Sequence, residues 1–506
     1  MLPHNNPDLE YLKLNGFRRI AYRLRGSLRE LPVKLLRGVG AIPRALRRTW
    51  QNAVSVVRTL IDTFRSGSNA TRASYFVMGL GQLMRGQILR GTLYLLFEIV
   101  FIGYMSLFGL KYLRDLRTLG TVASELYTDP ETGLQFTRYV DNSLLILLYG
   151  TLTVFFALAF LYAWYQNCKE NGESQLKREM GLPIPHARED LHALTDGQYY
   201  KTLLALPMSG IVLFTVIPIV FMVLIAFTSY DAAHLPPGKL FDWVGLENFA
   251  SIFGKSGGGK FGYTFGQVLI WTLVWAFFAT FTNYFLGMLV AMLINRRGIR
   301  GKSIFRTILV LTIAVPQFVS LLLVSRMFAD DGVVNGLLES YGIISSHLPF
   351  LSLGMYARVM VILINIWVGV PYIMLVATGI LLNIPAELYE SARIDGAGPL
   401  RVYRTITLPY MLFVTAPYLI TTFIGNINNF GVIYLLTGGG PTTLSYETPA
   451  GYTDLLITWL YKLTMGETGD YKMASVIGIL VFILIASFSL LVYNNTNSVR
   501  NEDDFQ

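Results

Sequence analysis

Long apolar runs separated by short polar segments dominate this chain. Eight runs are long enough to cross a hydrocarbon layer of about 30 Å as helices that rise about 1.5 Å per residue. They cover residues 91–110, 143–163, 203–228, 268–293, 308–328, 359–382, 410–437 and 474–492. The runs are continuous, whereas the strands of a membrane barrel alternate between apolar and polar residues. We therefore expect an all-α integral membrane protein with about eight transmembrane helices.

Composition and charge support this prediction and orient the chain. Its residues are 53% hydrophobic and only 14% charged, so much apolar surface must face lipid. Cytoplasmic flanks of membrane helices carry the excess of Lys and Arg. Most of the 41 Lys and Arg residues lie on the cytoplasmic side if the N-terminus is inside. This predicts a multi-pass protein of the cytoplasmic (cell) membrane, with both termini and the polar segment 385–409 in the cytoplasm.

The pattern predicts six parts along the chain. These are a basic cytoplasmic or interfacial region over 1–90, two transmembrane helices over 91–163, a cytoplasmic linker over 164–202, a third transmembrane helix with an external loop over 203–263, a core over 264–494 and a cytoplasmic tail over 495–506. Residues 1–66 suit either a basic amphipathic helix on anionic headgroups or a partly disordered tail that enforces topology. The glycines of Met78–Gly86 predict a short interfacial or re-entrant piece.

Several kinds of chemistry are excluded by the sequence. Gly254–Lys260 matches the start of a phosphate-binding loop, but Phe261 replaces the Ser or Thr that would hold magnesium. The single Cys168 cannot form an intrachain disulfide. The histidines lack metal-ligand spacing; they are His4, His186, His192, His234 and His347. We therefore predict no enzyme activity, no cofactor, no metal and no nucleic-acid partner.

One polar island interrupts the apolar C-terminal half. Residues 386–394 favour a helix, Gly396 and Gly398 break it, and Pro399 can begin a second short helix. A helix, a tight turn and a second helix make a stiff lever between two membrane spans. A polar, glycine-bearing segment could also be an ordinary connector, and composition alone favours that interpretation.

Polar side chains also recur at helical spacing inside two spans. Asn365, Gly369 and Tyr372 stand at i, i+4 and i+7, with Val368 beside them. A second set in the next span repeats this spacing: Thr422, Asn426 and Asn429. Such groups either join helices or line a cavity. Because they are uncharged, a cavity built from them suits a neutral polyhydroxylated ligand such as a sugar.

The island resembles the EAA coupling loop of ABC importer permeases. Glu390, Asp395-Gly396-Ala397, an aromatic residue and Ile406-x-Leu408-Pro409 follow the family pattern, and Ser391 replaces its usual Ala. Residues 426–430, 434–441 and 448–456 resemble the larger permease subunit of maltose and maltodextrin importers. The likeness extends from about Leu203 to Val492. It implies a type I importer permease fold with a six-helix core, made by the six runs that follow the linker.

This resemblance implies a function, partners and residue roles. The chain would be the permease subunit of an ATP-driven importer for maltose- or maltodextrin-type oligosaccharides. It would act with a second, smaller permease, two copies of an ABC ATPase and an extracytoplasmic sugar-binding protein, for which a lipoprotein would suit. Sugar-binding positions would be Asn365, Val368, Gly369, Tyr372, Thr422, Asn426 and Asn429. ATPase-coupling positions would be Glu390, Ser391, Ala392, Asp395, Gly396, Ala397, Gly398 and Tyr403.

Two alternatives stay open. Ile313 stands where the family can have Tyr, so the sugar could be another oligosaccharide such as a galactan or glucoside fragment. A self-sufficient secondary transporter would usually need ionisable groups inside its spans. Glu98 is the one obvious acidic candidate, and we favour a packing or interfacial role for it.

Overall fold

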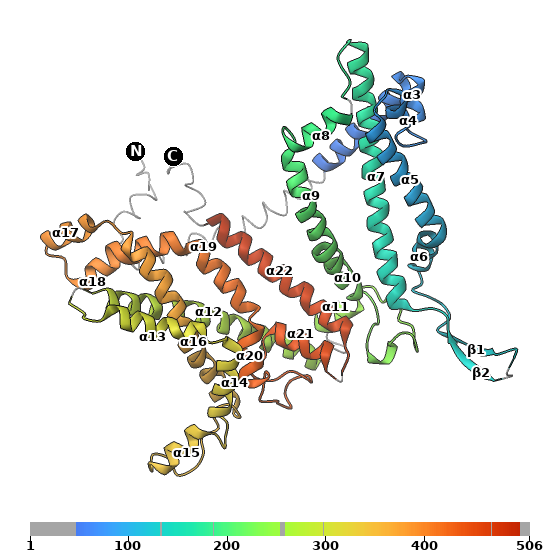
Figure 1. The fold of residues 1–506 in the computed structure, drawn as a ribbon. Coiled ribbons are helices and arrows are strands. Elements are labelled where there is room, and N and C mark those ends of the chain that lie inside the picture. Colours follow the sequence, from blue (N-terminus) through green and yellow to red (C-terminus); the bar gives the residue numbers. More distant parts are fainter. Residues whose placement is uncertain are drawn as a thin grey trace, which may run out of the picture. The chain divides into compact units, whose positions relative to one another are not determined.

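The computed structural model describes residues 47–495, apart from 132–133, 186, 254–258, 297 and 467 (Figure 1). The chain forms two compact units, which are treated separately below. The first comprises residues up to Lys111 together with Leu152–Gly210, and the second comprises Tyr112–Thr151 together with residues from Ile211 onward. The predictions for residues 1–46, for 254–258 of the phosphate-loop-like segment and for the tail beyond 495 lie outside the described residues.

Helices account for nearly all the regular structure, as expected. In the described part of the chain, seven helices are long and apolar enough to span a membrane. They are Ile88–Asp115 (α5, η1 and α6), Ser143–Glu179 (α7), Tyr199–Ile225 (α9, η2 and α10), Gly259–Asn295 (α12), Gly354–Leu382 (α16), Pro399–Ile427 (α18, η4 and α19) and Tyr471–Leu490 within α22 (Tyr471–Asn495). The all-α fold class is confirmed.

Two predicted spans are interrupted. The segment 308–328 was expected to be one helix, but α13 (Lys302–Ala314) and α14 (Gln317–Met327) meet at 90°. Pro316 explains the break, because a residue before proline is driven out of the helical region, and Val315 has ψ 127°. Likewise 410–437 is not continuous, since α19 (Leu408–Ile427) ends before α20 (Phe430–Thr437) begins.

In the first unit, the predicted re-entrant piece packs closely against the membrane helices. It contains α4 (Leu80–Met84), and α3 (Asn69–Ala73) precedes it. Gly79 between them has φ +82°, and a Cβ there would lie 2.9 Å from the carbonyl carbon of Gly91 in α5. Asn167 of α7 accepts hydrogen bonds from Gly79 N and Gln82 Nε2, both at 3.0 Å. Residues 47–66 are helical, and α8 spans Ala187–Thr195.

The second unit also contains short elements between its spans. The only described strands, β1 (Ser124–Thr128) and β2 (Gln135–Tyr139), pair antiparallel with Ser124 opposite Tyr139. Every residue in them is exposed, so no buried face marked them in the sequence. The short helices are η3 (Ala232–His234), α11 (Glu247–Phe253), α15 (Val333–Ser340), α17 (Ala386–Ile394), α18 (Pro399–Val402), η4 (Tyr403–Thr407) and α21 (Leu456–Met465).

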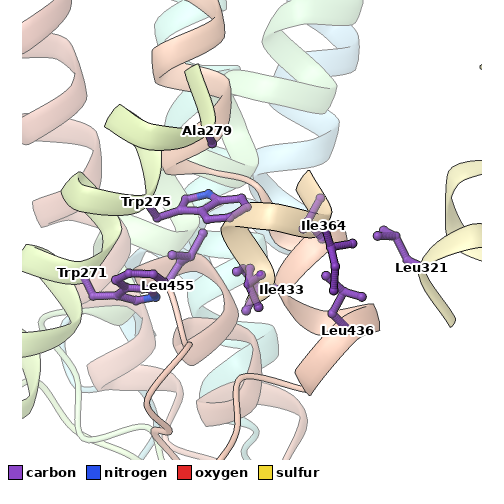
Figure 2. Packing of buried hydrophobic residues seen from close by; sticks show 10 residues of the cluster. Trp271, Trp275, Ala279, Leu321, Ile364, Ile433, Leu436 and Leu455 are labelled. Carbon is purple, nitrogen blue, oxygen red and sulfur yellow. The ribbon is translucent and has the colours of Figure 1, made fainter. Parts of the chain in front are cut away.

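The core of the second unit positions its polar residues. Helix α12 packs along α16 and against α19. Trp271 and Trp275 of α12 belong to one buried cluster with Ile364 of α16 and with Ile433 and Leu436 of α20 (Figure 2). These side chains are at most 5% exposed, so they hold the three elements firmly together. The next turns of α12 and α16 carry the polar groups described below.

Candidate functional site

A cavity of about 160 Å³ lies among α12, α16 and α19 in the second unit. Its wall residues are Ala279, Thr280, Asn283, Tyr284, Gly369, Tyr372, Ile373, Tyr418, Leu419, Thr422 and Asn426. Four of the positions predicted from the sequence are therefore brought together: Gly369, Tyr372, Thr422 and Asn426. Among the described wall residues, none is charged at neutral pH. The wall offers amides, hydroxyls, phenols and apolar side chains.

Hydrogen bonds fix Asn426 in this wall. Its side-chain Nδ2 donates to the hydroxyl of Thr280 at 2.9 Å. Its backbone carbonyl accepts the indole N–H of Trp275 at 3.1 Å. Because Thr280 and Trp275 are both buried on α12, these two bonds join α19 to α12 at the cavity. A change in the relative position of the two helices must break or rearrange them.

Asn283 and Gly369 form the closest approach between α12 and α16 at the cavity. A Cβ at Gly369 would lie 2.8 Å from Cγ of Asn283 and nearer still to its Nδ2. Only glycine leaves room for the amide in this arrangement. The Oδ1 atom of Asn283 is buried and has no hydrogen-bond partner among the described residues. An unpaired buried acceptor costs free energy, so this atom is suited to accept a hydrogen bond from a ligand hydroxyl.

Two tyrosines supply aromatic surface. The rings of Tyr372 on α16 and Tyr418 on α19 have centroids 6.5 Å apart, with an angle of 38° between their planes. Tyr372 is 50% exposed, so its ring is accessible. Aromatic faces with hydroxyl tips provide both apolar contact and hydrogen bonding.

Three predicted sugar-binding residues are not in the cavity wall. Asn365 is buried, and its Nδ2 has no partner among the described residues. Val368 packs against the tryptophan cluster. The expectation that Asn429 continues the helical face of Asn426 is wrong, because α19 ends at Ile427. Instead the side chain of Asn429 caps α20 by accepting from Val432 N at 3.2 Å, and its Nδ2 donates to Asn426 Oδ1 at 3.3 Å.

Helix α12 contributes polar residues to the cavity that were not predicted from the sequence. Thr280 and Asn283 lie in an apolar run, and a polar amide in such a run is a signal that could have pointed to them. Tyr418 was also missed, although it stands one turn before Thr422. In the described part of the chain, no group of three or more His, Cys, Asp or Glu side chains is placed to hold a metal ion.

The polar island has the predicted helix–turn–helix form. Helix α17 covers Ala386–Ile394 and ends in a Schellman motif, in which Ala397 N donates to Ala392 O at 2.9 Å and Gly396 N donates to Arg393 O at 3.0 Å. Gly396 has φ +70°, the left-handed conformation that this motif requires. Pro399 then begins α18 at its first turn.

The second half of the island continues directly into a membrane helix. From Pro399 the chain is helical to Ile427, passing through the π-helical turn η4. The hydroxyls of Tyr389 on α17 and Thr407 on η4 lie 3.1 Å apart and form a hydrogen bond. Tyr403 packs into a buried cluster that includes Met411. Helix α17 is thus tied by a side chain to the base of α19.

The outer surface of the island is apolar as well as charged. Ile394 is 87% exposed, and Leu388 and Leu400 are also exposed. Glu390, Asp395 and Gly396 are exposed beside them. Exposed aliphatic side chains beside these polar groups are suited to contact with another protein. In Figure 1, α17 and α18 project beyond the adjoining ends of α16 and α19.

Comparison with known proteins places this architecture in a family. Residues 283–500 match the model of the binding-protein-dependent transport system inner membrane component. This match includes the cavity residues on α16 and α19, Asn283 of α12 and the whole island.

Curated relatives extend the similarity over most of the chain. It is 35% identical over 437 residues to the maltodextrin transport system permease protein MdxF of Bacillus subtilis, covering 84% of this chain and 95% of the relative. It is 37% identical over 432 residues to the galactooligosaccharides transport system permease protein GanP of the same organism, covering 84% and 97%. It is 36% identical over 267 residues to the maltose/maltodextrin transport system permease protein MalF of Klebsiella aerogenes, covering 52% and 51%. The chain therefore belongs to the family of binding-protein-dependent transport system inner membrane components.

Proposed function

We propose that this chain is the permease subunit of an ATP-driven importer that moves maltodextrin-type oligosaccharides across the cytoplasmic membrane. The observation that carries the proposal is the uncharged cavity of α12, α16 and α19, with its unpaired Asn283 oxygen and its two tyrosine rings. Sugars present many hydroxyls and apolar ring faces, and this wall complements both. The names of the maltodextrin permease relatives support the choice of sugar.

The size of the cavity supports a second permease as partner. Pockets for small molecules usually measure about 300–1,000 Å³. A cavity of about 160 Å³ provides part of such a site. In our proposal, a smaller permease subunit supplies the remaining wall, and Asn365 and Asn429 support the site from behind Gly369 and Asn426.

The island of residues 385–409 supports an ATPase partner. We propose that two copies of an ABC ATPase act on the complex and that one of them covers the surface formed by Leu388, Ile394 and Leu400. With both termini and the island in the cytoplasm, closure of the ATPases would push α17. The Tyr389–Thr407 bond would pass this push to α19 and so to Asn426. An extracytoplasmic binding protein would deliver the sugar to the cavity from the other side of the membrane.

A galacto-oligosaccharide is the second candidate substrate. Identity to the galactooligosaccharide permease is 37%, slightly above the 35% to the maltodextrin permease, so overall similarity does not separate the two sugars. A secondary transporter is disfavoured. Glu98 accepts a hydrogen bond from Met78 N at 2.7 Å and so holds the re-entrant piece of the first unit.

ATP hydrolysis by the assembled importer tests the proposed substrate. The chain is purified with the subunits that assemble with it, reconstituted, and supplied with binding protein preloaded with maltotriose or with galactotriose. Stimulation by maltotriose is expected. Stimulation by galactotriose alone would replace the maltodextrin proposal with the galacto-oligosaccharide one, and ATP-independent uptake by this chain alone would refute both.

Substitution of Gly396 tests the coupling role. Gly396→Trp should abolish uptake while the amount of chain in the membrane stays normal, because a bulky side chain at φ +70° distorts the turn under the ATPase surface. Gly398→Ala is the matched control, since Gly398 has φ −70° and no described atom lies within 4 Å of a Cβ there. Normal uptake with Gly396→Trp would rule out the coupling role.

A further inference from the structure

A polar pocket of about 470 Å³ lies in the first unit, outside the site described above. The start of α5, the C-terminal part of α7, helix α8 and the start of α9 form its walls. Its charged lining residues are Arg90, Lys169, Glu170, Glu173, Lys177, Glu189, Asp190 and Lys201. The pocket thus stands where two membrane helices meet a polar segment.

Ion pairs use some of these charges and leave two lysines. Arg90 donates twice to Asp190, at 2.7 and 2.5 Å, and lies 3.7 Å from Glu170. Lys169 lies 3.9 Å from Glu173. In the described part of the chain, Lys177 and Lys201 form no ion pair, and Lys201 Nζ donates to the neutral Gln198 at 2.9 Å. These two ammonium groups are therefore in no described ion pair, and the same wall also carries the carboxylate of Glu189.

An apolar pocket of about 360 Å³ continues from the polar one. Arg90 and Glu170 line both pockets, and the remaining wall of the apolar one consists of Leu93, Tyr94, Phe97 and Ala163. Ala163 and Lys177 lie on the same helix, α7, and fourteen residues of helix extend about 21 Å. One leaflet of a bilayer, headgroups included, is about 20–22 Å thick. The joined pockets thus match the length of one membrane lipid.

We propose that the joined pockets are a binding site for one anionic phospholipid. Its phosphate would lie at Lys177 and Lys201, and one acyl chain would lie along Leu93, Phe97 and Ala163. The wall carries four basic and four acidic side chains, and its two lysines outside ion pairs supply the contacts for the phosphate of an anionic headgroup. The apolar continuation favours a lipid over a free phosphate compound, because a soluble anion would leave the groove at Phe97 and Ala163 unfilled. The site lies within the first unit and is independent of the sugar proposal.

Native mass spectrometry of the full-length chain, purified in detergent with the subunits that assemble with it, tests this site. The probes are phosphatidylglycerol, phosphatidylcholine with the same acyl chains, and glycerol 3-phosphate. We expect one tightly bound phosphatidylglycerol, with weaker binding of phosphatidylcholine and no detectable binding of glycerol 3-phosphate. Removing both charges in K177A/K201A should weaken phosphatidylglycerol binding by about 30-fold. Arg178→Ala, next to Lys177 but outside the pocket wall, should leave it unchanged.

A second pair of variants tests the acyl-chain groove. Ala163→Trp should fill the groove and displace the lipid, whereas Leu161→Trp, on an exposed part of α7 outside the groove, should not. Thermal unfolding of each variant separates lost binding from lost folding, and Leu93→Trp replaces Ala163→Trp if the latter unfolds. Wild-type affinity in K177A/K201A, or glycerol 3-phosphate binding as tightly as the lipid, would overturn the proposal. Retention of the lipid by both folded groove variants would also overturn it.

Discussion

Replacing Gly369 by alanine is the sharpest test of the cavity. The new Cβ would lie 2.8 Å from Cγ of Asn283 and nearer still to its Nδ2, so the amide must withdraw by more than the roughly 0.6 Å that would restore an ordinary contact of 3.4 Å to Cγ. Overpacking of this kind costs about 1–3 kcal/mol. A displaced amide would also lose the hydrogen bond to the sugar that we propose for it, which would be worth about 0.5–1.5 kcal/mol, or about 2- to 12-fold. We expect the variant to be less stable and slower in transport.

Uptake into vesicles that contain the assembled importer, with saturating loaded binding protein, measures the transport effect. Gly379→Ala is the matched control: Gly379 lies on the same helix, and no described atom is within 4 Å of a Cβ there. It should transport normally and be slightly more stable, because alanine favours the helix. Equal uptake by the Gly369→Ala and Gly379→Ala variants would refute the role of this contact.

A double substitution distinguishes the steric effect of the new Cβ from the loss of the Asn283 amide. Asn283→Ala combined with Gly369→Ala removes the clash but does not restore the amide, so stability should recover while uptake stays low. Recovery of uptake together with stability would show that Asn283 only fills space. The sugar would then have to be bound by other groups.

Two further predictions concern ion pairs beside the spans of the second unit. Asp454 is fully buried and accepts a hydrogen bond from Lys462 Nζ at 2.7 Å. Asp454→Ala should therefore lower the free energy of unfolding by about 3–5 kcal/mol, because it leaves the lysine charge unpaired, whereas the double variant Asp454→Leu with Lys462→Met should lower it less. Equal losses for the two variants in denaturation experiments would contradict this. Burial raises the pKa of Asp231, but hydrogen bonds from Lys472 and His234 outweigh it and hold that pKa below its ordinary value. The ionised Asp231 therefore stabilises the fold fully above about pH 4, and this contribution is lost as pH falls through the pKa of the folded state. Asp231→Asn should thus reduce the decline in Tm below about pH 4, and an unchanged decline would refute this.

Local signals predicted the polar island well. The bounds of α17, the turn at Gly396 and the start of α18 at Pro399 follow from backbone preferences that neighbouring residues determine. The break at Pro316 has an equally local cause, but the apolar pattern continues through it. Hydropathy alone therefore predicted one straight span where two helices meet at 90°.

The cavity was only partly predictable, because tertiary packing assembles it. Gly369 and Asn426 were found from helical spacing within single spans. Thr280 and Asn283 join them through contacts across about 90 to 150 residues of sequence, which spacing within one helix cannot reveal. Asn429 shows the opposite error: the spacing is helical, but the helix ends two residues earlier, and the side chain caps the next one.

The helix is unbroken from Pro399 to Ile427, so the displacement at the cavity can be calculated for a given tilt at its base. Thr422 lies fifteen residues beyond Thr407, or about 22 Å along the helix axis. Because the helix rises about 1.5 Å per residue, a tilt of about 10° at Thr407 would carry Thr422 sideways by about 4 Å and Asn426, four residues further on, by about 5 Å. That displacement exceeds the 2.9 Å bond between Asn426 and Thr280, so the bond cannot survive such a tilt unless α12 moves too. Under the proposed coupling, this hydrogen bond would therefore have to open and re-form in every transport cycle.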